Sequence, residues 1–134
     1  MQPAALVKTA LVAILLAFAG TSSATALEQK KYDAGEFKAA QAAGKPVVIH
    51  VSAPWCPTCK AQHEVLDELA EKPDFAAVTL FQVDFDTEKD VLKTFKASQQ
   101  STLIAFNGAT ETGRVVGQTS LKAIEGLLMS SMKN

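Results

Sequence analysis

The feature that most constrains this chain is a pair of cysteines, Cys56 and Cys59, between an apolar β-branched run at 47–51 and a segment with helical spacing. A strand that turns directly into a helix presents Cys56 to the unpaired N–H groups at the helix start. The partial positive charge there favours a thiolate over a thiol. Pro57 suits the first helical turn because its φ is already helical and no N–H is left unpaired. The spacing therefore predicts a redox-active dithiol.

Residues 1–26 are predicted to be a signal peptide. Lys8 supplies a basic start, an apolar run covers 10–19, and 24–26 has the small residues that a signal peptidase accepts. Cleavage after Ala26 would release a domain of residues 27–134 into the periplasm or the medium. The alternative is an uncleaved membrane anchor, for which the apolar run is short of the roughly 20 residues that span a bilayer.

Charge and cysteine usage narrow the class of protein. The chain has 13 basic and 14 acidic side chains and a formal net charge of −1, which argues against nucleic acid as a partner. Its 2 cysteines both lie in the one motif, so a framework of structural disulfides is excluded and redox chemistry is favoured. Lys60 follows Cys59 where a c-type haem site needs histidine, and we expect no cofactor.

Hydrophobic periodicity predicts one α/β domain with a central sheet between layers of helices. After a polar opening at 27–31, the expected elements are helix 33–43, strand 47–52, helix 56–72, strand 78–85, helix 87–97, strands 102–106 and 114–116, and a helix capped by Ser120. The near-continuous apolar strands are typical of parallel strands that are buried on both faces. The turn at Asn107-Gly108 predicts an antiparallel return of the last strand.

From Tyr32 to Met132 the chain resembles the thioredoxin superfamily. Four segments occur in the family's order: Ala-Pro-Trp-Cys at 53–56, Val-Leu-Asp-Glu-Leu-Ala at 65–70, Val-Asp-Phe-Asp at 83–86, and Thr-Leu-Ile-Ala-Phe before Asn-Gly at 102–108. The Cys-Pro-Thr-Cys motif is also similar to that of exported thioredoxins of cytochrome c maturation. The resemblance implies the thioredoxin fold, a mixed β-sheet with helices on both faces.

The resemblance also implies a function, that of a thiol:disulfide oxidoreductase. Cys56 would be the attacking nucleophile, Cys59 the resolving thiol, and Trp55 and Pro57 would flank and support them. The expected partners are proteins with disulfides and an upstream membrane or periplasmic electron donor, and a monomer is expected. A reductant is favoured over an oxidant because exported oxidants of this superfamily usually carry a helical insert.

Three residues depart from the thioredoxin pattern. His50 stands in place of a buried aspartate, Gln82 in place of a lysine, and Ser101 in place of the cis-proline that faces the dithiol. A cis bond before a non-proline residue costs ~3–4 kcal/mol, so we expect a trans Gln100–Ser101 bond. Gln100 and Ser101 are the predicted substrate-binding loop, which the change would reshape.

His50 has two interpretations. It is either a core histidine whose ring nitrogens are satisfied by neighbours, or a base that accepts the Cys59 proton during resolution. The choice depends on geometry.

A second hypothesis is a metal-binding or peptide-binding module with weak redox activity. Cys56, Cys59 and His63 could share one helix face and bind zinc or copper, with Ser101 leaving room that a proline ring would fill. No fourth ligand is evident in the sequence. We therefore expect no metal and a solvent-facing His63.

Overall fold

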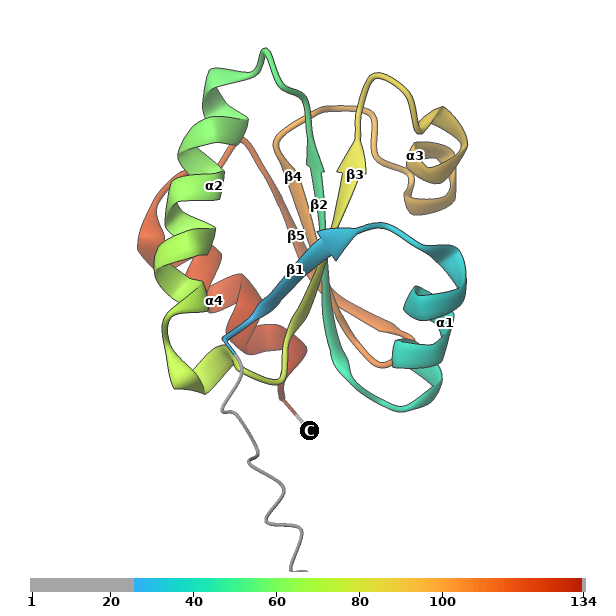
Figure 1. Cartoon of the computed structure of the whole chain (residues 1–134), viewed down its shortest axis with the longest axis vertical. Coiled ribbons are helices and arrows are strands. Elements are labelled where there is room, and N and C mark those ends of the chain that lie inside the picture. The colour runs from blue at the N-terminus through green and yellow to red at the C-terminus, as the bar shows by residue number, and fades with distance from the viewer. Residues whose placement is uncertain (1–25, 134) are drawn as a thin grey trace, which may run out of the picture.

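The computed structural model describes residues 26–133, which form a five-stranded sheet with the strand order β1-β3-β2-β4-β5 (Figure 1). The strands are β1 Glu28–Lys31, β2 Pro46–Ser52, β3 Thr79–Asp84, β4 Thr102–Asn107 and β5 Thr110–Val116. The helices are α1 Ala34–Ala42, α2 Pro57–Ala70, α3 Lys89–Phe95 and α4 Leu121–Ser131, with a 3-10 turn at Pro73–Phe75. The predicted signal peptide lies outside the described residues except for Ala26, and its cleavage stays a prediction.

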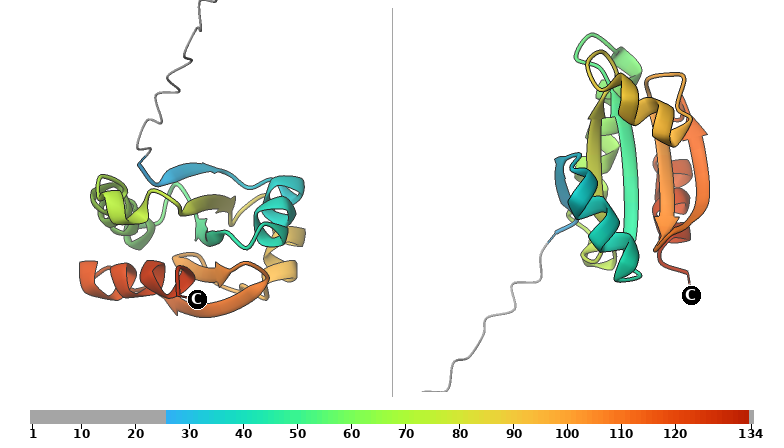
Figure 2. Two further views of the ribbon diagram at one scale, coloured as in Figure 1. Left: turned by 90° about the horizontal axis from the view of Figure 1, so that it is seen from below. Right: turned by 90° about the vertical axis from the view of Figure 1, so that its right-hand side faces the viewer.

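The sheet is mixed, as predicted. Strand β3 pairs in parallel with β1 and β2, whereas β4 pairs antiparallel with both β2 and β5. Helices α2 and α4 cover one face and α1 and α3 cover the other, the latter pair lying toward the viewer in the right panel of Figure 2. None of the helices within 26–133 is long and apolar enough to span a membrane.

The central strand β2 accounts for this two-sided burial. Val47, Val48, Ile49 and Val51 have no exposed surface. Because successive side chains of a strand point to opposite faces, Val48 packs in the core under α2 and α4, and the other three pack in the core under α1 and α3. The continuous apolar run therefore predicted both the strand and its central position.

The sequence pattern missed β1. Its side chains are all polar and none is fully buried, so the segment has no apolar alternation to recognise. The strand forms because its backbone pairs with β3, beginning with Glu28 beside Thr79, while Leu27 just before it enters the core. The strand β5 begins at Thr110, earlier than the predicted 114, because it continues from the hairpin turn along β4 on a largely exposed edge.

Helix starts agree with their predicted caps. The Asp33 carboxylate accepts the Glu36 N–H at 2.8 Å, and the Ser120 hydroxyl accepts the Ala123 N–H at 3.2 Å. At α2 the N-cap residue is Cys56 itself, which places the dithiol at a helix start.

Phe81 tests the core under α1 and α3. Its side chain is 1% exposed and meets Tyr32 and Phe37 edge-on, with ring centroids 6.1 Å from each. We expect Phe81→Ala to lower the free energy of unfolding by ~3–5 kcal/mol, because it removes a large buried side chain and leaves a cavity. Urea unfolding measures this. Lys93→Ala on the exposed face of α3 is the control, and equal stabilities of the two variants would contradict the assignment.

Candidate active site

The cysteine motif lies where β2 leads into α2. The Cys56 N–H donates to the carbonyl of Ala53 at 3.2 Å, and Cys56 keeps an extended backbone before Pro57 begins the helix. The Cys59 N–H then donates to Cys56 Sγ at 3.1 Å. The first turn of α2 therefore directs a backbone dipole at Cys56, as its position in the sequence predicted.

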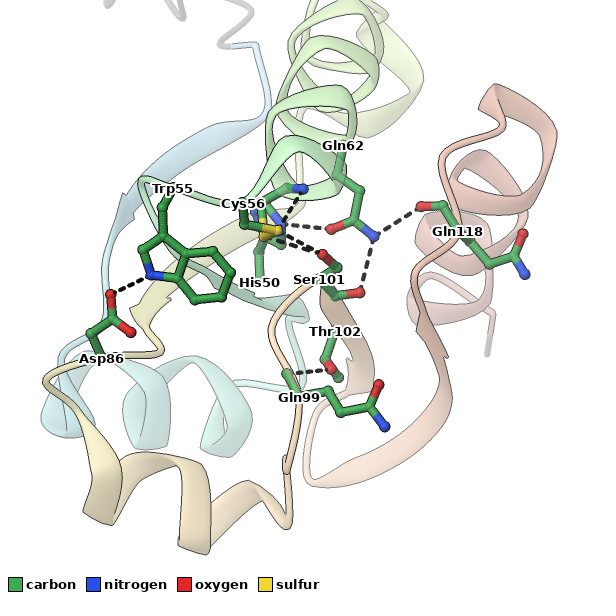
Figure 3. The surroundings of a disulfide bond; sticks show 10 residues. His50, Trp55, Cys56, Gln62, Asp86, Gln99, Ser101, Thr102 and Gln118 are labelled. Carbon is green, nitrogen blue, oxygen red and sulfur yellow. Dashed lines mark hydrogen bonds between the residues drawn. A yellow bond between two sulfur atoms is a disulfide. The ribbon is translucent and has the colours of Figure 1, made fainter.

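The two cysteines form a disulfide, with their Cα atoms 5.2 Å apart. Cys56 is 4% exposed and Cys59 is 1% exposed. The Ser101 hydroxyl lies 3.1 Å from each sulfur, so one oxygen contacts both ends of the bond (Figure 3). The motif and the loop before β4 thus meet at the disulfide.

Ser101 has an unusual backbone. The Gln100–Ser101 bond is trans, as expected, since residues 26–133 contain no cis peptide. The φ of Ser101 is +59°, in the left-handed region that costs a non-glycine residue about 1–2 kcal/mol. Its carbonyl accepts the Gly117 N–H at 2.9 Å and the Gln62 side-chain amide at 3.0 Å, and these bonds hold the strained conformation.

Gln62 connects this loop to the central strand. Its amide nitrogen donates to the carbonyls of Ser101 and Gln118, at 3.0 Å and 2.8 Å, so its oxygen is left to accept from His50 Nε2 at 3.0 Å. His50 is therefore the tautomer with hydrogen on Nε2. Gln62 was not among the predicted site residues. Gln62 lies four residues before Leu66, and residues at this spacing share one face of a helix. The helical spacing could therefore have indicated that Gln62 is buried with Leu66.

His50 is a neutral core residue. Burial, with a smaller contribution from His63, lowers the pKa of its imidazole to about 4, although the Gln62 hydrogen bond acts in the opposite direction. Nδ1 is buried without a hydrogen-bond partner in the described chain, so only one of its two nitrogens is satisfied. An imidazole with so low a pKa holds a thiol proton weakly, and its role as proton acceptor stays a prediction.

Trp55 flanks the disulfide. Its side chain is 59% exposed, and its indole N–H donates to the Asp86 carboxylate at 2.9 Å (Figure 3). Asp86, which the sequence analysis did not assign to the site, thus orients this aromatic surface. In the loop that was predicted to bind substrate, Gln100 is half-buried and Ser101 is buried. The Gln82 amide donates to Gln29 at 3.3 Å, in an interaction between β3 and β1.

The alternative metal site is not formed. Within residues 26–133, no three histidine, cysteine, aspartate or glutamate side chains are grouped so that they could hold a metal ion. Cys56 and Cys59 are bonded to each other beside Ser101. The His63 ring instead packs against the His50 ring, with the two ring centroids 4.6 Å apart. His63 is accordingly half-buried: one part of its ring packs on His50, and the rest keeps contact with solvent.

Comparison with known proteins decides the family. The thioredoxin family model matches residues 28–130. The chain belongs to the thioredoxin family. A solved structure, that of Trxlp from Edwardsiella tarda EIB202, is 40% identical, and its match has a TM-score of 0.73 and covers 75% of this chain and 98% of that one. This membership confirms the predicted fold.

Two curated relatives extend the comparison. A thioredoxin H-type of Fagopyrum esculentum is 34% identical over 82 residues, which cover 61% of this chain and 69% of that relative. The thiol:disulfide interchange protein DsbE of Pasteurella multocida is 36% identical over 70 residues, which cover 52% of this chain and 34% of that protein. Family membership supports thiol:disulfide oxidoreductase activity for this thioredoxin-family chain.

The buried histidine predicts an acid-sensitive fold. Because the His50 pKa is about 4 in the folded protein and ~6.5 when unfolded, the unfolded state binds more protons between these values. Stability should therefore fall as the pH drops through that interval, by about 1 kcal/mol at pH 5.5 and up to about 3 near pH 4. Urea unfolding of wild type and His50→Asn over this range isolates the effect. Parallel pH dependence of the two proteins would contradict it.

Ser101 tests the departure from the thioredoxin proline. A proline has φ near −65° and cannot adopt the +59° observed here without moving the loop. We expect Ser101→Pro to lower the free energy of unfolding by more than about 1 kcal/mol. Ser101→Gly, which tolerates positive φ, is the matched control and should be the more stable variant in thermal unfolding. A proline variant as stable as the glycine variant would contradict this expectation.

Proposed function

We propose that this protein is an exported thiol:disulfide oxidoreductase that reduces disulfides of other proteins. The observation that carries the proposal is a Cys56–Cys59 disulfide at the start of α2 in a thioredoxin-family fold. Export rests on the sequence of residues 1–26, which predicts a signal peptide. The reductive direction rests on the resemblance to exported thioredoxins, and the likeness to DsbE is compatible with it.

The reaction begins with the reduced dithiol. The Cys56 thiolate attacks one sulfur of a substrate disulfide, forming a mixed disulfide and releasing the other substrate sulfur as a thiolate. Cys59 then loses its proton and attacks Cys56 Sγ, which releases the second substrate sulfur and closes the Cys56–Cys59 disulfide. The substrate thus gains two electrons, and its two sulfurs become thiols by taking up the two protons that Cys56 and Cys59 released. A periplasmic or membrane donor of two electrons restores the dithiol.

The assignment of Cys56 as nucleophile has a physical basis. Its sulfur accepts the Cys59 N–H at the helix start, an interaction that strengthens when the sulfur is charged. Cys59 is one turn inside the helix and is 1% exposed, which suits a thiol that reacts only within the protein. The exposed Trp55 beside the motif offers an apolar surface against which a substrate protein can lie.

Trapping separates the two cysteine roles. Cys59→Ser should accumulate mixed disulfides between Cys56 and substrate proteins, because the resolving thiol is missing. Periplasmic or secreted fractions are quenched with acid, and adducts are identified by non-reducing gel and mass spectrometry. Cys56→Ser is the matched control and should trap little. Equal trapping by both cysteine variants would contradict the assigned roles.

A turnover assay separates the proposal from a peptide-binding module. The wild-type protein, supplied with dithiothreitol, should reduce insulin disulfides, and Cys56→Ser should not. Absence of turnover by the wild type would favour the binding module.

A further inference from the structure

The Ser101 hydroxyl is the one side-chain oxygen found in contact with both sulfurs within residues 26–133. We propose that this hydroxyl is a catalytic hydrogen-bond donor that stabilises the Cys56 thiolate and thereby sets the reactivity and reduction potential of the dithiol. The proposal rests on the thiol–disulfide function proposed above, and it names the group that tunes that function.

The chemistry follows from the donor capacity of a hydroxyl. A serine side chain has one O–H donor and two acceptor lone pairs. Beside the disulfide, its partners are two weakly accepting sulfurs, each 3.1 Å away. When the bond is reduced and Cys56 becomes a thiolate, the same O–H faces a full negative charge. A hydrogen bond to a charged sulfur is stronger than one to a neutral sulfur, so the hydroxyl favours the reduced, ionised state.

Burial increases this effect. Ser101 is 4% exposed and the two cysteines are less than 5% exposed, so little water competes for the sulfurs. The contacts to Cys56 Sγ come from two neutral donors, the Cys59 N–H and the Ser101 hydroxyl, each at 3.1 Å. Because both donors are dipoles, removal of one should produce a measurable change in the thiolate pKa.

The hydroxyl is held in place by its backbone. The left-handed φ of +59° places Ser101 in a conformation that its neighbours must maintain. Its carbonyl accepts hydrogen bonds from Gly117 and from the fully buried Gln62, which in turn is anchored to His50. Gln62 is therefore a positioning residue for Ser101, and the hydroxyl needs little reorganisation when charge develops on Cys56.

The proposal has a direction for redox potential. Stabilising the thiolate stabilises the reduced form relative to the disulfide, so the hydroxyl makes the protein a milder reductant. The resemblance to thioredoxins leads one to expect a proline at this position. Proline has no hydroxyl and no N–H donor. Ser101 therefore gives this chain a donor that a proline at the same position cannot supply.

Two substitutions separate the hydroxyl from the backbone. Ser101→Ala and Ser101→Gly both remove the hydroxyl, but only glycine adopts φ of +59° without strain. The matched control is Ser98→Ala, an exposed serine in the same loop. For each reduced protein, the thiolate absorbance at 240 nm is titrated with pH. The equilibrium with glutathione then reports the reduction potential.

We expect both Ser101 variants to raise the pKa of Cys56 by about one unit or more. The equilibrium with glutathione should shift by about tenfold toward the disulfide form, which corresponds to ~30 mV more negative. Ser98→Ala should match wild type. Unchanged titration in both Ser101 variants would overturn the proposal, and so would a shift in only one of them, since that would assign the effect to backbone geometry.

These measurements need no substrate. If the protein failed to turn over protein disulfides, the proposed function would fail while the thiolate titration would still report on Ser101. Conversely, normal turnover with an unchanged titration in both variants would remove the hydroxyl from the mechanism and leave the oxidoreductase function in place.

Discussion

The arrangement of the site depends on the buried side chain of Gln62. Its amide group makes three hydrogen bonds. The amide oxygen accepts from His50 on β2, and the amide nitrogen donates to the carbonyl of Ser101, just before β4, and to the carbonyl of Gln118, before α4. A buried amide left without partners would destabilise the fold, so each of these segments must be in place for the others to be satisfied. One side chain of α2 thus couples the cysteine helix to the loops around it.

This coupling explains how a strained serine and a neutral histidine can lie beneath a reactive disulfide. Ser101 keeps its left-handed backbone because its carbonyl is bonded twice. His50 stays uncharged because it is buried and lies beside His63, although its hydrogen bond to Gln62 favours the charged form. The interior beside the sulfurs therefore contains polar groups that act as oriented dipoles. Of these groups the Ser101 hydroxyl contacts the sulfurs, and a neutral donor can favour a thiolate without bringing a second charge into the interior.

The two cores around the sheet explain why the site is held firmly. The central strand β2 is buried on both faces and ends at Ser52, four residues before Cys56. Helix α2 starts from that strand and packs through Leu66 and Leu69 against the core that it shares with α4. Because strand and helix are both packed, the turn between them presents the cysteines in a defined geometry.

The sequence by itself determined the features that depend on local pattern. Apolar periodicity predicted the helices and the central strands, and the caps at Asp33 and Ser120 predicted two helix starts. The cysteine motif and its flanking segments predicted that the dithiol lies at the start of a helix. These predictions succeeded because a helix start, a buried strand and a cap each depend on residues that are close in sequence.

Only the tertiary structure decided which distant groups meet. Strand β1 forms through backbone pairing with β3, which its polar side chains could not indicate. The contacts of Ser101 with both sulfurs, and of Gln62 with His50, join segments that are separated along the chain. Ser101 and His50 were predicted from the sequence as site residues, but their hydrogen-bond partners were not. Hydrogen bonds between distant residues depend on packing and leave no periodic pattern in the sequence.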